Sequence, residues 1–192
     1  MLSTEFDHSA RQALLGIARA SIVYGLRNDR PLEPELPALT GKLQAEGASF
    51  VTLKADLRLR GCVGSLAATR PLAMDVARNA YHAAFADPRF PRVRADEIPY
   101  LTVSVSILGE PEPVPVTNEA ELLASLRPGL DGLILEGLGY SATFLPDVWE
   151  ELDDPRDFVS SLKRKAGLDV DFWSRDLRFS RYRTFSFEER VG

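Results

Sequence analysis

Apolar residues recur at helical spacing near the start of the chain. Within residues 7–27, Ala13, Ile17, Ala20 and Tyr24 fall on one helical face. A second apolar row lies beside the first (Leu14, Ala18, Ile22 and Leu26). Because the combined face is wide, the pattern predicts a helix that is packed on more than one side.

Strand-like patterns follow this helix. Residues 49–54 and 57–65 are rich in β-branched and alternating residues, and they predict a hairpin joined at Ala55-Asp56. Residues 101–107 alternate apolar positions with Thr and Ser, which predicts a half-buried strand. The apolar side of that strand consists of Leu101, Val103, Val105 and Ile107.

A second long helix is predicted between the two strand regions. Pro71 suits its first position, and the helix should run to about Ala86, where Asp-Pro ends it. Its core-facing row is Leu72, Val76, Ala80 and Ala84.

The last third of the chain predicts a mixture of short elements. Thr117 can cap a short helix through Leu126, and Asp154 with Pro155 can begin a helix that Gly167 ends. The strand predictions here are a hairpin of residues 133–136 and 140–145, and a closing strand over residues 181–187.

The order of these elements bears on the fold class. Strands come in hairpins, and helices do not alternate with single strands. This order favours an α+β fold, a mainly antiparallel sheet flanked by helices, over a doubly wound parallel sheet. We expect a single domain over residues 7–188, with a boundary between two lobes near the proline-rich segment 111–115.

Composition narrows the function classes. The formal net charge is -5, so the strongly basic footprint of a nucleic-acid-binding protein is absent, and a cluster of four arginines near the C-terminus is interpreted as a solvated face. One cysteine and two histidines leave no zinc-type ligand set. The single cysteine, the lack of a secretory signal and the lack of a long apolar run together predict a cytoplasmic protein without a membrane segment.

The single cysteine stands out in the segment Leu59-Arg60-Gly61-Cys62-Val63-Gly64-Ser65. A free thiol has a pKa near ~8.5, and a neighbouring cation or backbone N–H groups lower it. Gly61 and Gly64 would let the backbone approach a ligand closely, and Arg60 would favour the thiolate if its side chain pointed the same way as the thiol. The alternative is a small buried cysteine in a glycine-rich strand, since cysteine is among the most buried residue types.

Six motifs together resemble the AMMECR domain family. They occur in the family's order and cover nearly the whole chain. In this sequence they are residues 59–65 (LRGCVGS), 87–91 (DPRFP), 104–108 (SVSIL), 142–149 (ATFLPDVW), 162–167 (LKRKAG) and 182–183 (YR). Val63 and Ser65 stand where the family more often has Ile and Thr.

The resemblance implies an α+β fold of a larger and a smaller subdomain with a cleft between them, and places the Arg-Gly-Cys segment near that cleft. It also implies Memo-type and radical-SAM proteins as partners, in a modification of a nucleobase or a metabolite. The family itself has no firmly assigned activity. Since the sequence carries no metal-ligand set and no nucleotide-binding fingerprint, we expect no cofactor of its own, and cofactor chemistry would belong to the partner.

Other candidate residues have two interpretations each. His82 could serve Cys62 as a general base, but its place near the end of a predicted helix favours a structural or solvent-facing role. Asp87 and Arg89 could bind a substrate's charged group, or they could form a turn in which Asp87 bonds local N–H groups. Ser104 could orient a substrate, or it could belong to the wet side of its strand.

Two hypotheses about function follow. In the first, the protein is an enzyme or enzyme component with Cys62 and Arg60 in catalysis. Its substrate-binding residues would be Gly61, Gly64, Asp87, Arg89 and Ser104. In the second, it is a non-catalytic binding or adaptor module in which Cys62 is structural.

Overall fold

The computed structural model describes residues 6–39 and 41–189. It confirms the α+β class: the described residues form helices and two four-stranded sheets with antiparallel strand pairing. The chain separates into two compact units, one with the residues up to Leu108 and again from Phe185, the other running from Gly109 to Thr184. Each unit has its own hydrophobic core.

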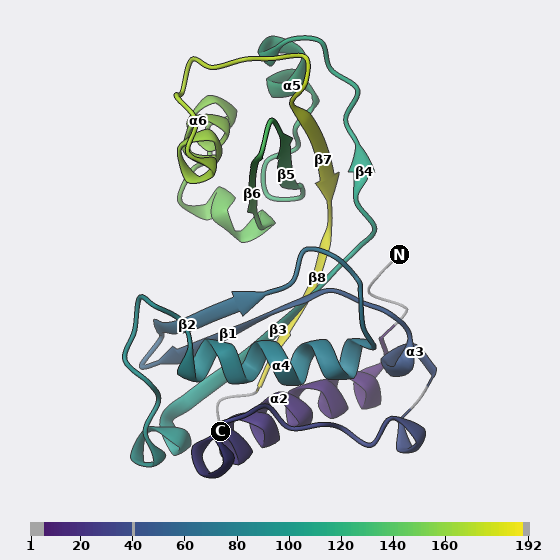
Figure 1. Ribbon diagram of the computed structural model, residues 1–192, viewed down its shortest axis with the longest axis vertical. Coiled ribbons are helices and arrows are strands. Elements are labelled where there is room, and N and C mark those ends of the chain that lie inside the picture. Colours follow the sequence, from purple (N-terminus) through teal and green to yellow (C-terminus); the bar gives the residue numbers. More distant parts are fainter. Residues whose placement is uncertain (1–5, 40, 190–192) are drawn as a thin grey trace. The chain divides into compact units, whose positions relative to one another are not determined.

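The first unit is a sheet with two helices on one face (Figure 1). Its strands are β1 (Ser49–Ala55), β2 (Arg58–Gly64), β3 (Leu101–Leu108) and β8 (Thr184–Glu188), in the order β2-β1-β3-β8. The helices are α2 (His8–Asn28) and α4 (Leu72–Phe85), with a short α3 (Gly41–Gln44). Short 3-10 turns, η1 (Leu36–Ala38) and η2 (Ala95–Tyr100), complete it.

Alternation along β1 and β3 creates the core of this unit. Val51, Leu53, Val103 and Val105 are fully buried beneath the helices, as the strand pattern predicts. The row Leu72, Val76, Ala80 and Ala84 of α4 is buried against them, which confirms the predicted core face of that helix. The opposite face of the sheet carries the intervening, mostly polar residues of β1, β2 and β3.

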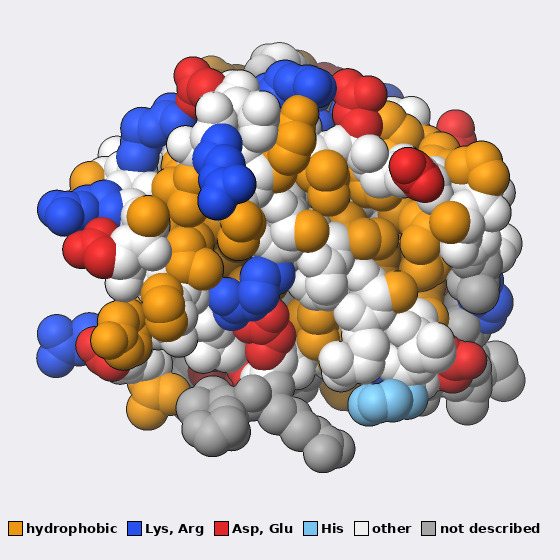
Figure 2. Space-filling view, turned by 90° about the horizontal axis from the view of Figure 1, so that it is seen from below, with side chains coloured by type: hydrophobic (Ala, Val, Ile, Leu, Met, Phe, Trp, Pro, Cys, Tyr) orange, Lys and Arg blue, Asp and Glu red, His pale blue; other side chains and the backbone are white. Residues whose placement is uncertain are grey.

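Helix α2 is packed on one broad side and open on the other, so the prediction that it is packed on more than one side was wrong. Asp7 caps its start by accepting from Ala10 N–H, and Leu14, Leu15, Ala18 and Ile22 are buried. Figure 2 shows a face of the molecule on which single charged side chains lie among the hydrophobic ones, so that the hydrophobic side chains do not form one continuous patch.

The second unit is a smaller sheet packed against a helix. Its strands are β4 (Glu112–Pro113), β5 (Gly132–Gly137), β6 (Tyr140–Phe144) and β7 (Arg178–Tyr182), in the order β4-β7-β5-β6. Its helices are α5 (Glu119–Ser125) and α6 (Pro155–Ala166), with a 3-10 turn η3 (Pro146–Glu150). Trp149 stacks on Phe158 with 3.8 Å between ring centroids and anchors the core between η3 and α6.

Caps and turns of this unit mostly match the sequence. Asp154 accepts from Arg156 N–H at the start of α6, and Gly167 ends it with a φ of 85°. The hairpin β5–β6 turns at Leu138-Gly139, both with positive φ. Among the residues described, no helix is long and apolar enough to cross a membrane.

Two predictions about helix starts were also wrong. The cap of α5 is Asn118, whose side chain accepts from Glu121 N–H, because Thr117 is instead tied back to the Glu121 carboxylate. Pro71 is the residue before α4 rather than its first residue.

The predicted closing strand 181–187 is in fact two strands. It is interrupted at Arg183, whose carbonyl accepts from Gly109 N–H. Strand β7 therefore belongs to the second sheet and β8 to the first, a division that alternation along one segment could not reveal.

Candidate functional site

Cys62 lies on the helix-free face of the first sheet, in a polar row that crosses three strands. It pairs with Thr52 of β1, and Thr52 pairs in turn with Ser104 of β3. Cross-strand partners lie on the same face of a sheet, so register alone brings these three side chains side by side. The Thr52 hydroxyl donates to Cys62 Sγ at 3.3 Å, and the thiol is half-buried. Ser104 is half-buried, and its hydroxyl makes no hydrogen bond with the described residues.

The main chain of Cys62 is held by an ion pair at the edge of the sheet. Strand β2 is the outer strand, so groups pointing away from β1 have no strand to pair with. Asp87 Oδ2 accepts from Cys62 N–H at 2.9 Å, and Arg89 Nη2 donates to the Cys62 carbonyl at 3.2 Å. The pair Asp87–Arg89, which we call the clasp, thus takes the place of a neighbouring strand at this one residue.

The clasp is internally bonded as well. Arg89 Nε and Nη2 donate to the two Asp87 oxygens at 3.0 and 2.7 Å, and Arg89 N–H donates to Asp87 Oδ1. These bonds, the one from the Arg89 side chain foremost, hold the pKa of the buried Asp87 carboxyl far below its usual range. Asp87 also raises the pKa of Arg89, with a smaller contribution from Cys62. The Arg89 side chain is 55% exposed, and its Nη1 group makes no hydrogen bond with the described residues.

Arg60 points to different partners. The register between β1 and β2 slips between Leu53 and Lys54, and Arg60 is the residue left unpaired by this bulge. Its guanidinium binds the Glu97 carboxylate at 2.7 and 3.1 Å and the Pro91 carbonyl at 2.8 Å. This contact with Arg60 is the main reason that the pKa of Glu97 is lowered. Arg89, not Arg60, is therefore the arginine that the structure places beside Cys62.

The two glycines of the motif are needed for close packing. A Cβ on Gly61 would lie 2.1 Å from the Ala83 carbonyl oxygen of α4, so this glycine lets the helix backbone rest on the strand. A Cβ on Gly64 would lie 2.2 Å from the ring of Phe50, its partner across the hairpin. Both contacts are made with the protein itself, whatever else these glycines do.

His82 is not among the contacts of Cys62. It lies in the last turn of α4, half-buried, with its ring edge-on to Tyr81. Its pKa is lowered, first by burial and then by the charges of Arg78 and Arg70. Among the described residues, His82 makes no contact with the Cys62 thiol.

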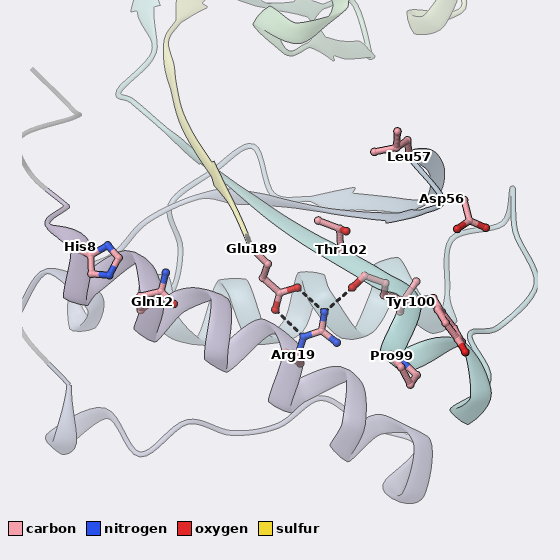
Figure 3. Close-up of a pocket in the computed structure, with 10 residues that line it drawn as sticks. His8, Gln12, Arg19, Asp56, Leu57, Pro99, Tyr100, Thr102 and Glu189 are labelled. Atoms are coloured by element: carbon pink, nitrogen blue, oxygen red, sulfur yellow. Dashed lines mark hydrogen bonds and ion pairs between the residues drawn. The ribbon is translucent and has the colours of Figure 1, made fainter. Parts of the chain in front are cut away.

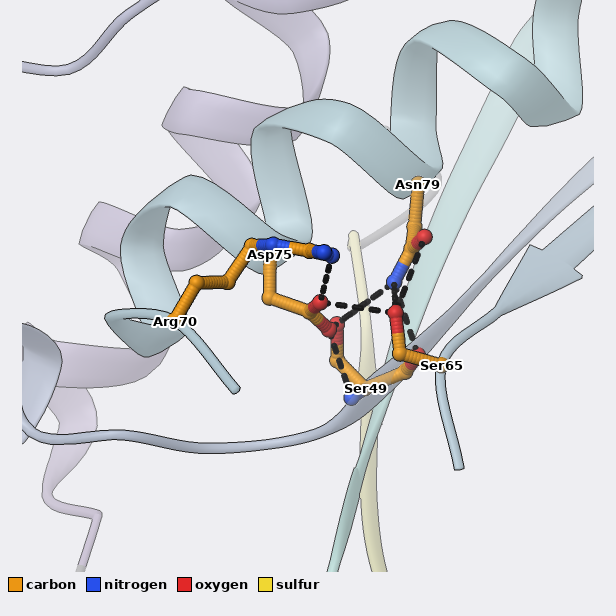
Figure 4. A network of polar contacts seen from close by, with 5 residues as sticks. All are labelled: Ser49, Ser65, Arg70, Asp75 and Asn79. Atoms are coloured by element: carbon orange, nitrogen blue, oxygen red, sulfur yellow. Dashed lines mark hydrogen bonds and ion pairs between the residues drawn. The ribbon is translucent and has the colours of Figure 1, made fainter. Parts of the chain in front are cut away.

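A buried polar network lies behind the motif and escaped the sequence analysis. The Asp75 carboxylate of α4 accepts from Ser49 N–H, Ser49 Oγ and Asn79 Nδ2 on one oxygen. Its other oxygen accepts from Ser65 Oγ at 2.7 Å and Arg70 Nη1 at 3.0 Å (Figure 4). The one available signal was Asp75 and Asn79, polar residues one turn apart and each directly before a residue of the core-facing row, Val76 and Ala80.

The same part of the chain shows no metal-binding geometry. Across residues 6–39 and 41–189, no three His, Cys, Asp or Glu side chains converge as ligands would. What the Cys62 cluster offers is a thiol with one hydroxyl donor, a fixed main chain and a half-exposed guanidinium close by.

Comparison with known proteins gives a consistent result. The family model described as AMMECR1 matches residues 15–187. A protein of Thermococcus gammatolerans is 38% identical over 183 residues, covering 92% of this chain and 88% of that one. A protein of Methanothermobacter thermautotrophicus is 35% identical over 182 residues, covering 93% of each chain.

A solved structure shares the fold. It is the crystal structure of the uncharacterized protein PH0010 from Pyrococcus horikoshii, with a TM-score of 0.85 and 32% sequence identity. The match covers 93% of this chain and 91% of that chain.

Proposed function

The chain belongs to the AMMECR1 family, and on that premise we propose that it works as an enzyme or enzyme component whose reacting group is the Cys62 thiol. The observation that carries this proposal is the clasp. It fixes both main-chain groups of Cys62 and brings the Arg89 guanidinium onto the carbonyl of the same residue whose thiol a hydroxyl contacts. A cation and a hydrogen-bond donor close to a cysteine are features of reactive cysteine sites.

Each residue of the cluster has a role in this proposal. The Cys62 thiolate would attack an electrophilic centre of the substrate. Arg89 would bind an anionic group through its unused Nη1 edge, while Nε and Nη2 stay with Asp87. Ser104 lies in the same polar row as Cys62, on the other side of Thr52, and its free hydroxyl would orient the substrate. Arg60 would act indirectly, by fixing Glu97 and the segment that follows the clasp.

The partners and substrate class implied by the family resemblance belong to this proposal too. We expect Memo-type and radical-SAM proteins to supply the cofactor chemistry, and a nucleobase or small metabolite to be the substrate. Capture of such partners from the organism's own lysate by the wild-type chain and by Cys62→Ser, side by side, tests this part.

A second function is favoured by the packing of the motif itself. Gly61 and Gly64 serve close contacts with Ala83 and Phe50, and no histidine base contacts the thiol among the described residues. These observations suit a non-catalytic binding module in which Cys62 is a packing residue of an edge strand.

Alkylation of the native protein separates the two. Cys62 is the only cysteine, so mass spectrometry after iodoacetamide treatment reports this one thiol. An activated thiol should react at pH 7 at least as fast in the native as in the urea-denatured protein. Near-complete protection across pH 6–9 would remove the thiol from the chemistry and leave the binding module.

Matched variants sharpen this test. Arg89→Gln should slow the native reaction by roughly two- to fivefold, the range for a partly exposed charge. The control is Arg58→Gln, which removes one positive charge from β2, the strand that carries Cys62. Arg58 is exposed and makes no ion pair with the described residues, so this variant should leave the rate unchanged. Equal effects of the two variants would mean that Arg89 acts only through net charge.

A further inference from the structure

The first unit has a hollow whose lining includes no residue of the Cys62 cluster. Its volume is about 830 Å³, within the range of small-molecule sites, roughly 300–1,000 Å³. It is lined by α2, by the β1–β2 turn, by the start of β3 and by Glu189 (Figure 3). Figure 3 shows His8 toward one end, Asp56, Leu57 and Tyr100 toward the other, and the Arg19–Glu189 pair between them.

The arginine of this hollow is already occupied. Arg19 Nε donates to Glu189 Oε1 at 2.6 Å and Nη2 donates to Glu189 Oε2 at 2.5 Å. Nη1 and Nη2 also donate to the carbonyls of Ile98 and Leu101 at 3.1 and 2.7 Å. Four donated bonds leave a single N–H of the five, so Arg19 cannot present the two-pronged donor that an anion prefers.

Glu189 is also fully engaged in hydrogen bonds within the protein. Glu189 Oε2 also accepts from Val103 N–H at 3.1 Å, and Glu189 N–H donates to the Val103 carbonyl. The pair therefore continues the edge of β3 where β8 ends, and its two charges cancel within the hollow.

The charge that stays free is negative. Asp56 has no hydrogen bond or ion pair with any residue that the structure describes, and it lines the hollow. It shares this end with two large apolar side chains, Tyr100 at 72% exposure and Leu57 at 89% exposure. A free carboxylate beside an exposed aromatic ring is the combination that attracts an organic cation.

The turn that carries Asp56 and Leu57 is strained. Both residues have positive φ, 50° and 63°, a conformation that glycine adopts without cost and leucine does not. Leu57 adds almost nothing to the core in return, because nearly all of its side chain is in solvent. The two-residue hairpin loop itself requires this backbone conformation, so the unusual feature is the residue: an exposed leucine stands where Asn or Gly is usual.

We propose that this hollow binds a small organic cation, a protonated amine with an apolar body. The ammonium group lies between the Asp56 carboxylate and the face of the Tyr100 ring, and the apolar body packs on Leu57. This site takes no residue from the Cys62 cluster, so it stands or falls independently of the proposed thiol chemistry.

Three probes that differ only in charge test the proposal: phenethylamine, 2-phenylethanol and phenylacetate. Each is titrated into the ¹⁵N-labelled full chain at pH 7.5 and low salt, with amide shifts followed by NMR. We expect phenethylamine to shift amides of residues 55–58 and 99–102 and to bind roughly two- to fivefold more tightly than the neutral alcohol. Phenylacetate should bind most weakly.

Substitutions of exposed residues test the site further. Asp56→Asn should abolish the preference of phenethylamine over 2-phenylethanol, and Tyr100→Leu should reduce it, while the exposed Asp153→Asn of the other unit changes neither. All three sites are solvent-exposed, so folding is preserved. Three results would each overturn the proposal: equal binding of phenethylamine and phenylacetate, amide shifts centred on other residues, or no saturable binding in the millimolar range. A surface that binds a protein partner instead would give equal binding of the two probes or no saturable binding.

Discussion

Loss of the buried charge at Asp75 should destabilise the first unit more than any other single polar change there. The Asp75 side chain is fully buried and accepts five hydrogen bonds, from Ser49 (two), Ser65, Asn79 and Arg70. Those donors come from β1, from the loop between β2 and α4, and from α4 itself. The carboxylate therefore joins α4 to β1 and to the loop that follows β2, the strand of Cys62.

The magnitude for Asp75→Asn follows from these contacts. An asparagine keeps one oxygen, which best serves the three donors on the Ser49 side, and turns its NH2 group toward Ser65 and Arg70. A hydrogen bond to a charged group contributes about 1.5–3 kcal/mol, and the Arg70 side chain is 33% exposed, which places its bond at the lower end. Adding the weakened bonds to a neutral acceptor, we expect a loss of about 2–4 kcal/mol of unfolding free energy.

The assay must report on the correct unit. Both tryptophans, Trp149 and Trp173, lie in the second unit, so their fluorescence follows that unit. Native-state hydrogen exchange on peptides of β1 and α4, measured at pH 7 over a series of urea concentrations, reads the first unit directly, whereas far-UV circular dichroism reports both units together. Arg70→Met is the matched control, because it leaves the carboxylate with four donors, and it should cost only about 1.5 kcal/mol.

A loss below about 1 kcal/mol for Asp75→Asn would refute this reasoning. So would an equal loss for Arg70→Met, since it would mean that the ion pair, rather than the convergence of donors on one buried carboxylate, stabilises the unit.

Further outcomes are expected elsewhere. Gly61→Ala should cost about 2–3 kcal/mol, since its Cβ meets the Ala83 carbonyl, whereas Gly16→Ala on the open side of α2 meets nothing within 4 Å and should stabilise by about 0.5–1 kcal/mol; urea midpoints that fail to move in opposite directions contradict this. Because the pKa of Asp87 is depressed on folding, its contribution is present at neutral pH and is lost as pH falls below the ordinary carboxyl value of about 4. Wild type should accordingly exceed Asp87→Asn in stability at pH 7, and the gap should narrow progressively at more acidic pH; a gap independent of pH would exclude the ionised clasp. Burial raises the pKa of Tyr182 to about 12, so the protein should lose stability as pH rises from about 10 towards 12, and Tyr182→Phe should remove the last phenol to ionise in an ultraviolet titration.

Local chemistry along the chain determined most of the elements. The helices α2, α4 and α6 follow from periodicity and end signals: Asp7 caps the start of α2, Asp154 caps the start of α6, and Gly167 ends α6 with a left-handed residue. The strands β1, β2 and β3 follow from alternation in the same way. These signals act within a few residues, and so they can be read from the sequence alone.

The surroundings of Cys62 were decided by tertiary structure. Its hydroxyl partner Thr52 is ten residues away, and Asp87 is twenty-five. Arg60 seemed the natural neighbour, yet a one-residue bulge sends it to Glu97, thirty-seven residues along the chain. A register slip of one residue changes which face a side chain occupies, and no local signal in the sequence fixes that register.

The closing segment shows the same limit at the scale of the fold. Residues 181–187 alternate like one strand, but the chain crosses from one sheet to the other at Arg183. Each half finds its partners far back in the sequence, β7 beside β5 and β8 beside β3. The sequence determines that these residues are extended, whereas the two separate cores determine which sheet each half completes, because pairing energy comes from long-range contacts that a single segment does not encode.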